Sequence, residues 1–128
     1  MNLEKVVFGF FVLLAATLNF GYVTGDIGNP DHHNIVELYA AVVVNIIATI
    51  LKFGDRTQVG AIHLAASLVA DIQLIFAAVL WVWYTQVQGG DLSVHEMSSV
   101  VSLALGALLA NVVSVVLTII ETANFRRH

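Results

Sequence analysis

The sequence predicts an all-α integral membrane protein, a four-helix bundle with short loops and with both termini on the cytoplasmic side. Four apolar stretches, residues 6–23, 35–51, 60–84 and 97–120, approach or exceed the length that spans a hydrocarbon core of about 30 Å at about 1.5 Å per residue. All five Lys and Arg residues lie at one end of these stretches, and the connecting segments at the other end contain none. By the positive-inside rule, the basic end is cytoplasmic. We therefore expect residues 1–128 to form a single four-span transmembrane domain.

The composition agrees with a membrane protein and excludes several other classes. Apolar residues make up 59% of the chain and charged residues 11%, which departs from the balance of soluble domains. The net charge of −4 argues against nucleic acid as a partner. The chain has no cysteine, so disulfides, Cys-ligated zinc, iron–sulfur clusters and thiol catalysis are excluded. Because no nucleophile–base pair, phosphate loop or dinucleotide fingerprint occurs, we expect that the protein is not an enzyme.

The first stretch, residues 6–23, follows Lys5 and has the length of a spanning helix rather than that of a signal peptide. It ends in Asn19 and Tyr22 without a small-residue cleavage pattern, so we expect it to be retained. The segment 25–34 after it includes glycines and the only proline, which is typical of an outer turn. Because this stretch is the least polar of the four, we expect it at the periphery of the bundle.

Each of the other three stretches has a small or polar face opposite a bulky apolar face on a helical wheel of about 100° per residue. Bulky apolar side chains suit lipid, whereas small residues let neighbouring helices approach closely. We therefore expect the small and polar faces to surround a polar interior. They consist of Glu37, Ala41, Asn45, Ala48, Thr49 and Lys52 in the second stretch, His63, Ala66, Ser67, Ala70, Asp71, Gln73, Ala77 and Ala78 in the third, and Ala104, Ala107, Asn111, Ser114, Thr118 and Glu121 in the fourth.

Asp71 is the strongest candidate for a functional residue, because it lies near the middle of the third stretch. A carboxylate at that depth costs about 2.5 to 3.5 kcal/mol to insert, and none of the four stretches contains a Lys or Arg to pair with it. Its candidate partners are Ser67, Gln73, Asn45, Asn111, a proton or a bound cation. Two interpretations follow. Asp71 belongs to a cation or proton site, or it is a protonated acid that joins the helices through hydrogen bonds.

A second candidate site lies at the outer helix ends, where His33, Glu37, His95 and Glu96 precede or begin the two inward-running stretches. Imidazole and carboxylate groups suit Zn²⁺ or another divalent ion, and histidines that titrate suit a pH sensor. The same residue types also serve as plain caps and solvated ends of helices. The remaining candidate histidine, His63, lies close to the start of the third stretch, and we expect it at the membrane interface rather than as a haem ligand.

The residues from Asn34 to Ala61, "NIVELYAAVVVNIIATILKFGDRTQVGA", and the "ADIQL" around Asp71 are similar to an uncharacterised family of short four-span bacterial inner-membrane proteins. The resemblance extends over nearly the whole chain. It implies a multi-pass protein of the bacterial inner (plasma) membrane. It further implies an association with potassium-channel-type proteins, and therefore a role related to cations.

Three functions fit these observations. The first is a homo-oligomeric cation channel or transporter, in which a ring of Asp71 side chains with Asn45 or Gln73 lines a symmetry axis and supplies oxygen ligands at mid-membrane. The second is a non-conducting accessory subunit of a larger cation channel or transporter. The third is a membrane protein that binds metal or senses pH through its outer histidines and acids. We expect the lipid bilayer and further copies of the chain as partners, and no cofactor beyond a monovalent cation or Zn²⁺.

Overall fold

The computed structural model describes residues 3–24, 34–54, 57–89 and 93–126. These residues form helices α1 (Leu3–Val23), α2 (Ile35–Lys52), α3 (Gln58–Val82) and α4 (Val94–Arg126), and α3 continues as a short π-helix, η2 (Trp83–Val87). Each of α1, α2, α3 with η2, and α4 is long and apolar enough to cross a membrane. The predicted bundle of four spanning helices is confirmed.

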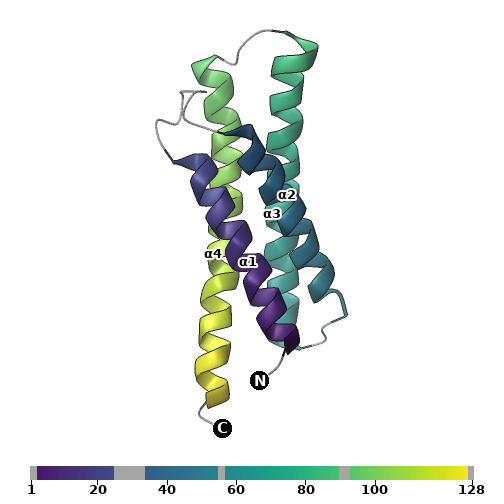
Figure 1. Cartoon of the computed structure of the whole chain (residues 1–128), viewed down its shortest axis with the longest axis vertical. Helices are drawn as coiled ribbons and strands as arrows, with labels where there is room; N and C mark the ends of the chain where they lie inside the picture. The colour runs from purple at the N-terminus through teal and green to yellow at the C-terminus, as the bar shows by residue number, and fades with distance from the viewer. Residues whose placement is uncertain (1–2, 25–33, 55–56, 90–92, 127–128) are drawn as a thin grey trace.

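The four helices run antiparallel to their neighbours, so that the start of α1 and the end of α4 lie at the same end of the bundle (Figure 1). They pack in the order α1, α2, α3 and α4, and α4 closes the ring against α1. An ion pair of 2.6 Å between Lys5 and Glu121 joins α1 to α4 near this end. We call it the inner end, because it carries Lys5 and Lys52, and we call the opposite end the outer end.

The helices extend beyond the apolar stretches because polar residues cap them. The Asn34 side chain accepts a hydrogen bond from Val36 N at the start of α2, and Thr57 Oγ1 accepts one from Gly60 N at the start of α3. At the start of α4, Ser93 and Glu96 each accept a hydrogen bond from the other's backbone N–H, which is a capping box. The starts of α2, α3 and α4 therefore lie at capping residues.

The prediction that α1 is peripheral is wrong. This helix packs against both α2 and α4 and buries Phe8, Val12, Asn19 and Tyr22. The Asn19 side-chain amide lies within hydrogen-bonding distance of the α4 backbone at Ala104 O and Leu108 N. Low polarity misled the prediction because, in a bilayer, a bulky apolar side chain fits equally well against lipid and against another helix.

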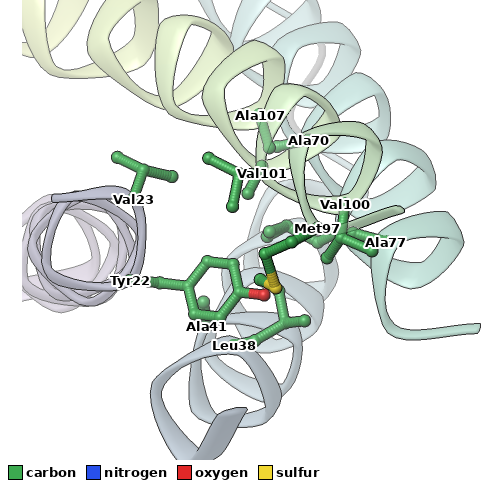
Figure 2. Close-up of a cluster of buried hydrophobic side chains, with 12 residues drawn as sticks. Tyr22, Val23, Leu38, Ala41, Ala70, Ala77, Met97, Val100, Val101 and Ala107 are labelled. Carbon is green, nitrogen blue, oxygen red and sulfur yellow. The ribbon is translucent and has the colours of Figure 1, made fainter. Parts of the chain in front are cut away.

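The apolar core lies toward the outer end of the bundle. The Tyr22 ring points from α1 toward Leu38 of α2 and Met97 of α4 (Figure 2). A smaller apolar cluster, Phe8, Val12 and Ala48, joins α1 to α2 nearer the inner end. The bulky face predicted for lipid is confirmed on α3, where the exposed large residues are Ile62, Leu68, Val69, Ile72, Ile75, Phe76, Val79 and Val82.

Candidate cation site

The buried faces of α2, α3 and α4 change from polar to apolar along the direction from the inner to the outer end, whereas α1 buries Phe8 and Val12 toward the inner end and Asn19 and Tyr22 toward the outer end. On α3 the buried polar residues His63, Ser67 and Asp71 lie toward the inner end, and the buried residues outward of them are Leu74 and Ala77. The same order holds on α2 and α4, which also run between the two ends. The buried polar residues of α2, α3 and α4 are Asn45, Thr49, Lys52, His63, Ser67, Asp71, Asn111 and Ser114.

Asp71 lies in the outer part of this polar region, one turn inward of Asn45, and is only 8% exposed. Thr49 Oγ1 lies 2.5 Å from Asp71 Oδ2 and 2.9 Å from the backbone oxygen of Asn45. A hydroxyl has one hydrogen and accepts through its lone pairs. Thr49 can donate to only one of these two oxygens. Both contacts can be hydrogen bonds if Thr49 donates to the Asn45 backbone oxygen and accepts a hydrogen bond from a protonated Asp71. The geometry thus fits a neutral carboxylic acid at this position.

Several other oxygen atoms in the polar region have no hydrogen-bond partner among the residues that the structure describes. They include Asp71 Oδ1, Ser67 Oγ and the side-chain oxygens of Asn45 and Asn111. The Asn45 Nδ2 group donates to the Ala41 backbone at 3.1 Å, so its oxygen remains available. Buried polar atoms normally find partners, because an unpaired one loses its hydration without compensation. These oxygens are therefore available to a ligand.

The register of α3 and α4 places Asn111 near the depth of Asp71. A Cβ added to Gly106 would lie 2.7 Å from Gln73 Nε2, so the two residues are in contact across the helix pair. From this contact, Asn111 lies five residues toward the inner end on α4. The residue five positions toward the inner end on α3 is Leu68, so Asn111 is level with the segment between Ser67 and Asp71. Asn111 is only 1% exposed and thus faces the interior at this level.

The predicted site residues therefore separate into two groups. Asp71, Ser67 and Asn111 face the interior at neighbouring depths, and Asn45 lies one turn outward of Thr49 on the same face of α2. Gln73 is only partly buried and packs against Gly106 in the contact between α3 and α4. Thr49 completes the site; it was predicted on the polar face of α2 but without a role. Its signal was its spacing of four residues from Asn45.

Two further residues of the polar region, His63 and Lys52, were not predicted for the site. His63 is 1% exposed, so it faces the interior of the bundle, and its depth near the membrane interface stays a prediction. The Phe8 ring packs against the His63 ring at 4.9 Å between centroids, and Lys52 Nζ lies 4.3 Å from the centroid of the same Phe8 ring. A cation near an aromatic face is a favourable contact. The four-residue spacing of His63, Ser67 and Asp71 was the signal for His63.

The outer histidine and acid set is only partly described. His33 lies outside the described residues, His95 is exposed, and Glu96 is held in the capping box of α4. Glu37 packs directly on Gly21 of α1, so closely that a Cβ on Gly21 would collide with its carboxylate. Within the described ranges, no group of three or more His, Asp or Glu side chains could hold a metal ion. The outer metal site stays a prediction.

Comparison with known proteins provides a family and no activity. A family of unknown function (DUF6394) matches residues 32–122, which include α2, α3 and most of α4. No curated protein and no solved structure matches the chain.

Proposed function

The chain belongs to this family of unknown function, and we propose from its own geometry that it is a cation transporter or channel of the bacterial inner membrane. In this proposal Asp71 binds the cation inside each bundle. The observation that carries the proposal is a 92% buried position for a carboxyl group whose second oxygen has no partner among the described residues. Ionisable groups at mid-membrane are costly and are typical of ion and proton pathways.

A site inside the bundle replaces the ring on a symmetry axis that the sequence suggested. Asp71 and Asn45 face the interior of their own chain, and Gln73 faces α4. A ring would need these side chains on the outside of the bundle. Copies of the chain can still associate through their apolar faces, but the proposed cation site does not require them.

The chemistry of the proposed site is an exchange of one proton for one monovalent cation. The neutral acid at Asp71 releases its proton and leaves a carboxylate, and the cation that enters restores the charge. Side-chain oxygens of Ser67 and Asn111, which lie at neighbouring depths, supply further ligands of the kind that hard cations prefer, and Asn45 lies one turn outward as the next oxygen along the interior. The net charge in the bilayer stays constant through the exchange, which avoids the cost of an unpaired buried charge.

Flux measurements in reconstituted liposomes test this proposal. A gradient of Na⁺ or K⁺ should drive proton movement in the wild-type protein, detected by a pH-sensitive dye in the lumen. Asp71→Asn should abolish this movement while it preserves folding, since the amide keeps the volume of the acid. Glu121→Gln is the matched control, because it removes a carboxylate from the inner-end ion pair and should leave the flux unchanged. Undiminished flux in Asp71→Asn would contradict the proposal.

A non-conducting accessory subunit of a larger cation channel is the second candidate. The observation that favours it is the apolar outer core, including Leu38, Leu74 and Met97, which interrupts a polar path through a single bundle. In that case Asp71 joins α2 to α3 through Thr49 and binds no cation. The absence of wild-type flux under both ion gradients and an applied potential would favour this role.

A further inference from the structure

We infer that, in the conformation of this structure, the Asp71 site communicates with the inner end of the bundle only, and that Phe8 and Lys52 lie at this entrance and restrict it. The inference rests on the proposed function, because it concerns the route by which a cation or proton reaches the same site. It goes further by assigning a side of access and by giving roles to two residues outside the site.

The outer route is closed by packed apolar side chains. Immediately outward of Asp71, the buried residues of α3 are Leu74 and Ala77, and the buried residues of α2 outward of Asn45 are Ala41 and Leu38. Figure 2 shows the Tyr22 ring directed into this layer from α1. Apart from the Tyr22 hydroxyl, the side chains of this packed layer are apolar, so a hydrated cation would give up its water with almost no oxygen ligand to replace it, which is strongly unfavourable.

The inner route is lined by polar side chains. His63, Ser67 and Asp71 follow one another at intervals of four residues, so they lie on one face of α3 about 6 Å apart along the axis. Ser114 of α4 and Thr49 of α2 are buried in the same half of the bundle. Hydroxyl and imidazole groups in a row can pass a proton or replace part of a cation's hydration shell. Polar groups thus extend from Asp71 toward the inner end.

Phe8 and Lys52 lie where this polar row meets the inner end. The Phe8 ring contacts His63 on one helix and Lys52 on another, so a single side chain of α1 spans the mouth. Lys52 is 6% exposed and lies at the last residue of α2, where the helix dipole favours a positive charge. The ring blocks the mouth sterically, and the ammonium group repels an entering cation.

Single cysteines can test the side of access, since the natural chain contains no cysteine. Ser67→Cys and Ala77→Cys are matched, because both place a small thiol at a buried position on the same face of α3. In vesicles of known orientation, a small cationic methanethiosulfonate should modify Ser67→Cys from the inner side and not from the outer side. Ala77→Cys should remain unmodified from both sides. Modification of Ser67→Cys from the outer side at an equal rate would overturn the inference.

Substitutions in the Ser67→Cys background test whether Phe8 and Lys52 form a gate at the inner end. Phe8→Ala should raise the modification rate for both a cationic and a neutral reagent, because it opens the mouth. Lys52→Gln should raise the modification rate about tenfold for the cationic reagent only. This is the effect expected when a positive charge about 10 Å from the reagent is removed at an effective dielectric constant of about 20. Lys52→Arg, which keeps the charge, should leave both rates unchanged.

Two results would contradict the gate: no modification of Ser67→Cys even with Phe8→Ala, or equal effects of Lys52→Gln on both reagents. Modification needs no transport, so the two proposals fail separately. If Asp71→Asn leaves flux unchanged, the proposed function fails whatever the modification pattern. If flux depends on Asp71 but Ser67→Cys reacts from the outer side, only the inner access fails.

Discussion

The hydrogen bond between Thr49 and Asp71 joins α2 to α3 at the proposed site, and Thr49→Val removes it while keeping the shape of the side chain. The two oxygens are 2.5 Å apart, and both side chains are buried. In a soluble core, a buried acid that loses its partner would cost about 1 to 3 kcal/mol. In a bilayer the unfolded helices also find polar partners, so interhelical hydrogen bonds average about 0.6 and reach about 1.7 kcal/mol. We expect Thr49→Val to lower the free energy of unfolding within this smaller range.

A double-mutant cycle isolates the bond from other effects of the substitution. Unfolding in mixed micelles is measured for the wild type, Thr49→Val, Asp71→Leu and the double variant. The coupling energy should be about 0.6 to 1.7 kcal/mol, because Thr49→Val has no acid to lose in the Asp71→Leu background. Thr49→Ser keeps the hydroxyl and serves as the control for the bond itself. An equal cost of Thr49→Val in both backgrounds would refute the assignment of this hydrogen bond as a link between the helices.

Three further predictions concern other parts of the chain. A thiol at Gln88→Cys should react with an impermeant reagent from outside the cell and one at Gln58→Cys should not; the reverse pattern would overturn the orientation derived from the basic residues. Calorimetric titration should show Zn²⁺ binding that weakens as the pH falls and imidazole takes up a proton, and an isotherm unchanged by alanine at both His33 and His95 would reduce the outer set to capping. Gly106→Leu should lower the free energy of unfolding by about 1 kcal/mol in the same micelle assay, because the Gln73 amide has to move out of the contact between α3 and α4, and a neutral result would contradict that contact.

The sequence was sufficient to predict the helices and the inward faces of three of them. The wheel position of Asp71, Asn45 and Asn111 follows from a fixed rotation per residue, and all three are buried. This property is local to one helix, which is why it could be predicted without knowing how the helices pair.

The remaining features depend on contacts between helices. Gln73 lies at the edge of the polar face, and its contact with Gly106 is set by the register of α3 against α4. Lys52 was predicted on the inward polar face, but its contact with the Phe8 ring depends on how the distant helix α1 packs against α2. The bundle interior at Tyr22 could not be predicted because lipid and protein are equally apolar surroundings.

The central claim is that Asp71 is a protonated acid that exchanges its proton for a monovalent cation. Infrared difference spectroscopy in lipid nanodiscs measures this directly, because the carbonyl stretch of a protonated carboxyl group is distinct from the bands of a carboxylate. We predict a protonated-acid band in the wild type that Asp71→Asn removes and that disappears when Na⁺ or K⁺ is added at constant pH. A band assigned to Asp71 that no cation concentration alters, or its absence from the wild type before addition, would contradict the account.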